Sequence, residues 1–217
     1  MNKSISRPIL GKHTEAGVYI IESLDFEDEN TPKEGKMISD ILELSGIENT
    51  YQYVRTKAEL IYFIDDFAHS NLRFLHLSCH GDNNSITTTL DNISHIELSK
   101  ILYGKLKFRR LFLSACSTVN DSLAKYLFKN SGCNSIVGPN EDVHMDEIAI
   151  FWASFYHLMF KNNPSAMKKK DLVATLDSLV KLYNVPICYY KKSTRSPYYN
   201  EEKIEQSTPK PKFEDFT

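Results

Sequence analysis

A histidine–glycine pair and a cysteine are the residues of this chain whose types and spacing best fit covalent chemistry. His80 and Gly81 follow the apolar run Leu72–Ser78, and Cys116 directly follows a second apolar run, Arg110–Ala115. A thiol beside an imidazole is the minimal equipment for nucleophilic acyl transfer, because the base raises the thiolate fraction and the thiolate attacks a carbonyl carbon. The pattern predicts that Cys116 is a nucleophile and that His80 acts first as a base and then as an acid.

The tetrahedral intermediate of such a reaction needs hydrogen-bond donors for its oxyanion. The backbone N–H groups of Gly81 and of Cys116 itself are the candidates, because both residues follow strand ends. A glycine at position 81 permits close approach of a substrate, and the small Ala115 leaves room beside the thiol. On spacing alone, the alternative stays open that His80 is a turn residue and Cys116 an unrelated buried thiol.

Strands that alternate with helices must position these residues. Short runs of aliphatic, β-branched and aromatic residues are typical of buried strands, and the segments between them carry apolar residues at helical spacing. The predicted strands are 17–22, 50–55, 72–78, 110–115 and 135–138, and the predicted helices are 32–45, 57–69, 96–103, 121–130, 145–160 and 166–183. This alternation predicts an α/β fold, a three-layer α/β/α sandwich with a mostly parallel central sheet.

The carboxyl ends of parallel strands meet at one edge of a sheet, where ligands of such folds bind. The separation of His80 from Cys116 along the chain fits one crossover with a short hairpin, so their strands are expected to be neighbours. A last strand is expected at 186–190. Beyond it the chain is rich in Pro, Lys and Glu, so we expect a folded domain over residues 1–192 and a loose tail over 193–217.

Composition limits the classes of protein to which the chain could belong. It carries 26 Lys and Arg against 28 Asp and Glu, a formal net charge of -2, and this balance argues against direct nucleic-acid binding. The sequence has neither an apolar run long enough to cross a bilayer nor a secretory signal at its start, so we expect a cytoplasmic protein with no membrane partner. Four cysteines without paired spacing predict free thiols rather than disulfides or a zinc site.

The other cysteines and the polar residues near the pair are mostly explained as structural. Three cysteines are expected to be buried thiols: Cys79, Cys133 and Cys188. In an extended strand end, Cys79 should point away from His80. His76 is expected to pack within its strand and Asp82 to form a turn, whereas His144, after the fifth strand, could reach the cleft.

The segment from residue 72 to residue 160 resembles the CHAT domain, a caspase-like group of cysteine proteases. The main matching motifs are Phe74–Gly81, with the sequence Phe-Leu-His-Leu-Ser-Cys-His-Gly, and Leu111–Cys116, with the sequence Leu-Phe-Leu-Ser-Ala-Cys. Further matches are the helix at 98–102, Leu123, Ala124, Leu127, Gly132, Ile136–Gly138, Val143–Asp146 and Phe155–Tyr156. The resemblance implies a caspase-like fold in which His80 and Cys116 form a catalytic dyad that needs no third member, metal or cofactor.

The resemblance also implies a cysteine endopeptidase that cleaves a protein substrate, with Asp146 near the pocket for the residue before the scissile bond. Bacterial members of the group often act in defence or cell-death modules, antiviral defence included, and are switched on by a partner, so an activating or sensor protein is expected as well. The stretch between His80 and Cys116 is shorter than in many members, and no fused repeat precedes residue 72. Any gating is therefore expected to come from another chain or from the tail, if it exists at all.

Two other classes of function stay open. A catalytically idle caspase-like domain that serves as an interaction module would keep the fold, although the intact His-Gly and Ala-Cys motifs speak against it. A flavodoxin-like ligand-binding domain would share the alternation of strands and helices. In that case a glycine-rich phosphate loop would be needed after the first strand, where the segment 22–25 has the sequence Glu-Ser-Leu-Asp.

Overall fold

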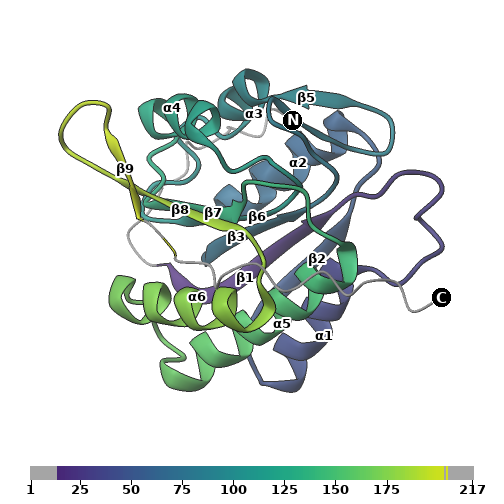
Figure 1. The fold of residues 1–217 in the computed structure, drawn as a ribbon. Helices are drawn as coiled ribbons and strands as arrows, with labels where there is room; N and C mark the ends of the chain where they lie inside the picture. Colours follow the sequence, from purple (N-terminus) through teal and green to yellow (C-terminus); the bar gives the residue numbers. More distant parts are fainter. Residues whose placement is uncertain (1–13, 203, 205–217) are drawn as a thin grey trace, which may run out of the picture.

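A seven-stranded sheet lies at the centre of the computed structural model, which describes residues 14–202 and 204 of the chain (Figure 1). The strands are β1 (Glu15–Glu22), β2 (Asn49–Tyr53), β3 (Leu72–Ser78), β4 (Ser85–Thr87), β5 (Asn92–Ser94), β6 (Arg110–Ser114), β7 (Ser135–Pro139), β8 (Ile187–Lys192) and β9 (Tyr199–Glu202). The order in the sheet is β2-β1-β3-β6-β7-β8-β9, and β4 pairs with β5 in a separate hairpin. Strands β2 to β7 of that order run parallel, whereas β8 and β9 run antiparallel to their neighbours.

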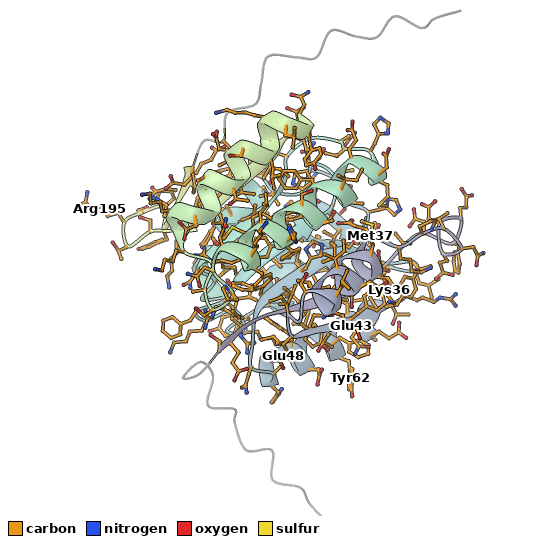
Figure 2. The ribbon with its side chains drawn as sticks, turned by 90° about the horizontal axis from the view of Figure 1, so that it is seen from below. Lys36, Met37, Glu43, Glu48, Tyr62 and Arg195 are labelled. Carbon is orange, nitrogen blue, oxygen red and sulfur yellow. The ribbon has the colours of Figure 1, made fainter. Side chains whose placement is uncertain are left out.

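Helices cover both faces of this sheet (Figure 1). One face carries α2 (Lys57–His69), α3 (His95–Ile101) and α4 (Asp121–Asn130), and the other carries α1 (Glu34–Leu44), α5 (Met145–Asn162) and α6 (Lys169–Tyr183). Figure 2, seen from below, shows α6, α5 and α1 side by side across the second face. The predicted three-layer α/β/α sandwich with a mostly parallel sheet is therefore confirmed. In the described part of the chain, no helix is long and apolar enough to span a membrane.

Each face of the sheet packs against an apolar core of its own. Along β1, Val18 and Ile20 point to the face of α1, α5 and α6, while Tyr19 and Ile21 point to the opposite face. All four side chains are buried, because a parallel strand between two helical layers meets apolar side chains on both sides. This is why the strands are continuous apolar runs in the sequence. Helix α5 is buried along much of its surface, with Trp152 fully inside.

The predicted elements are confirmed with small shifts at their ends. Asn120 caps the start of α4, since its side chain accepts a hydrogen bond of 3.1 Å from the backbone N–H of Leu123. The strand expected at 186–190 is β8. The sequence does not predict β9, which lies within the segment expected to be a tail and pairs with β8. Within that segment, residues 203 and 205–217 lie outside the described residues.

Strands β3 and β6 are neighbours, as the spacing predicts. Their register pairs Ser78 with Ser114, the last residue of each strand, and the N–H of Cys79 donates to the carbonyl oxygen of Ser114 at 3.0 Å. The segments that carry His80 and Cys116 therefore leave the sheet side by side, at its carboxyl edge.

Candidate active site

The side chains of His80 and Cys116 line one cavity of about 190 Å³ at the carboxyl edge of the sheet. His80 lies two residues beyond the end of β3, and Cys116 lies two residues beyond the end of β6. The other residues of the lining are Glu34, Cys79, Ser114, Ala115, Pro139, Val143, His144, Met145 and Ile148. The structure thus brings a thiol and an imidazole to the same small space.

The imidazole of His80 contacts the loop between β1 and α1. Its Nε2 atom lies 3.2 Å from Oδ2 of Asp28 and 3.9 Å from Oδ2 of Asp25. A carboxylate only accepts hydrogen bonds, so Nε2–H is the donor in this contact, and in a neutral imidazole with this contact Nδ1 carries the lone pair that a base needs. The side chains of His80 and Asp28 are 37% and 44% exposed, so solvent screens this pair.

Sequence patterns do not find Asp28. It belongs to the acidic segment 25–29, which begins three residues after the last residue of β1 but has no motif that links it to His80. The two residues meet because β1 is the neighbour of β3 in the sheet, so the loops after these strands lie beside each other. The acidic segment is the one feature of the sequence that could have indicated a partner for His80. It indicates one only when the strand order is known.

The loop that carries Cys116 is fixed against the segment after β7. The thiol of Cys116 donates to the carbonyl oxygen of Val143, with 3.5 Å between Sγ and O. The next residue, Ser117, has a φ of 56°, in the left-handed region that non-glycine residues rarely adopt. Its N–H donates to the carbonyl oxygen of Glu141 at 3.1 Å, and its hydroxyl donates to Asp142 at 2.8 Å. These bonds hold the thiol at a sharp turn on the edge of the cavity.

Gly81 lies where the loop after β3 touches the loop after β6. A Cβ atom at this position would lie 2.3 Å from Oγ1 of Thr118 and 3.0 Å from Cβ of Ala115. The first distance is shorter than real Cβ contacts and the second is tight, so a side chain at position 81 would push the two loops apart and a glycine lets them approach each other. Substrate access, expected from the sequence, is thus joined by a second reason for this glycine, which is its contact with Thr118.

The N–H groups of Gly81 and Cys116 donate no hydrogen bond within the part of the chain that the structure describes. By contrast, the N–H group of the next residue in each loop is hydrogen-bonded. The N–H of Asp82 donates to the carbonyl oxygen of Ser85 at 2.9 Å, and the N–H of Ser117 donates to the carbonyl oxygen of Glu141. Unpaired N–H groups beside a nucleophile are suited to stabilise an oxyanion. Asp82 also accepts from the N–H groups of Asn84 and Ser85, which agrees with the turn predicted for it.

Buried polar side chains lie beneath the cavity. Glu34, the first residue of α1, is 3% exposed, and its Oε2 atom accepts from the hydroxyls of Ser78 at 2.9 Å and Ser114 at 2.8 Å. Its Oε1 atom has no hydrogen-bond partner among the described residues and lies 3.6 Å from Nε2 of His76. His76 is fully buried in β3, as predicted, with Nδ1 2.9 Å from the hydroxyl of Tyr156. The sequence gives Glu34 no role beyond its place in a helix.

The other three thiols are held in the protonated form. Burial raises the pKa of Cys79, Cys133 and Cys188 from 9.0 to about 12 in each case. Cys79 lines the cavity together with His80, although the alternation of the strand suggests that it points away. Within residues 14–202 and 204, no three His, Cys, Asp or Glu side chains are grouped so that they could hold a metal ion.

A larger cavity of about 660 Å³ adjoins the first and shares His80, Glu34, His144 and Met145 with it. Asp146, exposed in the first turn of α5, lines this larger cavity rather than the smaller one. Apolar side chains of α1 and α5 form much of the remaining lining: Met37, labelled in Figure 2, Met145, Ala149 and Ile150. The structure therefore places Asp146 in the cleft beside His80, and His144 reaches the cleft as well.

No protein-family model matches the chain, and no curated protein matches it. Among solved structures the chain is similar to the crystal structure of the Arg specific cysteine proteinase gingipain R, with a TM-score of 0.52 and 12% sequence identity. The similarity covers 79% of this chain and 46% of the gingipain chain, so this chain spans less than half the length of that protein. At this identity the likeness shows the fold, and the protein has a caspase-like α/β fold.

Proposed function

We propose that the protein is a cysteine endopeptidase that cleaves a protein substrate with Cys116 as the nucleophile and His80 as the base. The observation that carries this proposal is that both side chains line one cavity, at the ends of neighbouring parallel strands. The fold supports the same class, since a cysteine proteinase of known structure shares it.

The proposed reaction proceeds through a thioester. Nδ1 of His80 takes the proton of the Cys116 thiol, the thiolate attacks the peptide carbonyl, and the N–H groups of Gly81 and Cys116 stabilise the oxyanion. The imidazolium then protonates the leaving amine, and the peptide bond breaks to leave an acyl group on Cys116. Water, deprotonated by His80, hydrolyses the thioester and the thiol is restored. In this scheme Asp28 orients the imidazole and stabilises its charged form, and neither a metal nor a cofactor takes part.

We assign the protein more finely to the CHAT group on the motifs Phe74–Gly81 and Leu111–Cys116. With this assignment we propose that the protein is a cytoplasmic effector of a bacterial defence or cell-death module, antiviral defence included. In this role an activating or sensor protein would switch it on. The resemblance of the motifs is the support for this role.

For the specificity of cleavage we propose a basic residue before the scissile bond, recognised by Asp146. Gingipain R is Arg specific by its description. In this chain the carboxylates of Asp146 and Asp28 both line the larger cavity beside His80, and a carboxylate forms charge-assisted hydrogen bonds with a guanidinium or ammonium group.

A phosphate-binding role of the flavodoxin kind is disfavoured by the start of α1. The N-terminus of a helix after the first strand is where such folds bind phosphate. Here the carboxylate of Glu22 already accepts from the N–H groups of Gly35 at 2.8 Å and Lys36 at 3.2 Å. The position that a phosphate would need is therefore occupied by a side chain of the protein.

Hydrolysis of a panel of fluorogenic peptides by single-residue variants tests the proposed function. Cys116→Ala and His80→Ala should each abolish cleavage, and thermal melts should show that both variants stay folded, because the two side chains lie in loops. Cys79→Ala is the matched control, since its thiol lines the same cavity but should keep activity. Equal loss in Cys79→Ala and Cys116→Ala would show that the nucleophile is assigned to the wrong thiol.

A further inference from the structure

A buried carboxylate joins the ends of the two strands from which the proposed dyad emerges. Oε2 of Glu34 accepts from the hydroxyls of Ser78 and Ser114, which face each other as the last pair of the β3–β6 ladder. Each serine lies two residues before a member of the dyad, His80 or Cys116. One atom therefore connects both strand ends at the level where the active-site loops begin.

We propose that Glu34 is a positioning residue, whose carboxylate sets the separation between His80 and Cys116 through Ser78 and Ser114. This inference rests on the proposed protease function. Glu34 does not take part in the chemistry in this proposal. It acts through the two serines.

The backbone alone does not fix this separation. The bond from the N–H of Cys79 to Ser114 is the last backbone hydrogen bond between the two strands, and within the described residues none joins segment 80–83 to segment 115–118. Farther out, two side chains of the loop after β6 donate to backbone carbonyl oxygens of the loop after β3: Thr118 to Asp82 at 3.4 Å and Asn120 to Asn83 at 3.0 Å. Side chains, rather than backbone hydrogen bonds, therefore link the two loops, and Glu34 is the link at the strand ends.

Glu34 is itself held rigidly enough to act in this way. It begins α1, where Glu22 accepts from the N–H groups of the next two residues, and the hydroxyl of Tyr51 donates to Glu22 at 2.7 Å. Burying a carboxylate is costly unless it is hydrogen-bonded, and the two serine hydroxyls supply those bonds. A group so placed on a fixed helix end can hold the strand ends, and errors of about 1 Å in such geometry cost about 100-fold in rate.

Two substitutions of Glu34 separate positioning from charge. Glu34→Gln keeps an oxygen that can accept from both serines and removes the charge, whereas Glu34→Leu keeps similar volume and removes the acceptor. We expect Glu34→Leu to lower kcat about 100-fold with little change in KM, and Glu34→Gln to stay within about threefold of wild type. Ser78→Ala and Ser114→Ala should each lower kcat, and adding Ser78→Ala to Glu34→Leu should cost nothing more, because the bridge is already lost.

Hydrogen exchange measures the same effect without catalysis. In a Cys116→Ala background, exchange in peptides covering 79–82 and 115–118 should be faster in Glu34→Leu and unchanged in Glu34→Gln, at a temperature where circular dichroism shows both variants folded. If wild type cleaves no peptide while this difference in exchange is seen, the proposed function fails and the structural bridge stands.

Three outcomes would overturn the positioning role. One is unchanged kcat and unchanged exchange in Glu34→Leu. Another is an equal loss of kcat in Glu34→Gln and Glu34→Leu, since the charge rather than the bridge would then matter. Should Glu34→Leu fail to fold, Ser78→Ala and Ser114→Ala decide the question, and wild-type kcat and exchange in both would refute the proposal.

Discussion

The Oδ2 atom of Asp28 lies 3.2 Å from the Nε2 atom of His80, so a carboxylate from the loop after β1 is within hydrogen-bond distance of the imidazole. The resemblance to the CHAT group implies a dyad that needs no third member, and the structure shows a carboxylate in contact with the imidazole of His80. Because both side chains are partly exposed, this carboxylate should contribute less than a buried one that orients a catalytic histidine.

Asp28→Asn should lower kcat about 10-fold, because the amide stabilises the imidazolium less well than the carboxylate does. Asp25→Asn is the matched control: its carboxylate belongs to the same loop but lies 3.9 Å from Nε2 and is 56% exposed. We expect it to behave like wild type in steady-state hydrolysis. Equal losses in the two variants would mean that the general negative charge of the loop, and not the contact with His80, supports activity.

Iodoacetamide at pH 7 should label Cys116 ahead of the other three cysteines. Burial raises the pKa of Cys79, Cys133 and Cys188 to about 12, so each is a thiolate in roughly one molecule in 10⁵ at this pH. Their thiolate fraction should rise about 10-fold for each unit of pH up to their pKa, so labelling of these three should grow steeply in alkaline buffer. Peptide mapping measures the order, and labelling of Cys133 as fast as Cys116 at pH 7 would contradict an activated Cys116.

Gly81→Ala should damage the site, because the added methyl group would overlap Oγ1 of Thr118. We expect a loss of about 1–3 kcal/mol in the free energy of unfolding, together with lower activity, as the two loops are forced apart. Thr118→Ala removes the overlapping hydroxyl, so the double variant should recover part of both losses. Denaturant unfolding and peptide hydrolysis measure the two effects, and a fully active Gly81→Ala would show that the loops approach each other less closely.

The strands and helices were predictable because each depends on residues close together in the chain. Runs such as Val18–Ile21 are apolar on both faces, which is typical of a parallel strand between helices. The start of α4 is marked by the cap at Asn120. By contrast, β9 has the sequence Tyr-Asn-Glu-Glu, whose acidic side chains carry no strand pattern. It is a strand because its backbone pairs with β8, and the local sequence does not predict that pairing.

The shared cavity of His80 and Cys116 was predictable for a related reason, and the acidic residues beside it were not. His80 and Cys116 each follow a recognisable strand, and the spacing between them implies that those strands are neighbours. Asp28 and Glu34 come to the site because β1 lies next to β3, on the side away from β6. Many strand orders are compatible with the same alternation of strands and helices. From the sequence alone, Asp28 and Glu34 are therefore two acidic residues close to the start of a helix. Their contacts can be known only once the strand order is known.

Asp146 and Glu147 are adjacent acidic residues in the first turn of α5, both exposed, but of the two Asp146 alone lines the larger cavity beside His80. If Asp146 recognises a basic residue before the scissile bond, Asp146→Asn should lower kcat/KM about 10-fold for peptides with Arg or Lys there and leave peptides with Gln unchanged. Glu147→Gln is the matched control and should keep the preference for Arg and Lys.

The two variants should be matched in stability. Each substitution removes a favourable charge from a helix N-terminus, so both should cost about 0.3–1 kcal/mol in the free energy of unfolding, and thermal melts check that the two costs are similar. A peptide library profiled with wild type and both variants gives the answer, and a wild-type preference for an apolar or acidic residue would refute the basic pocket while leaving the roles of His80 and Cys116 intact.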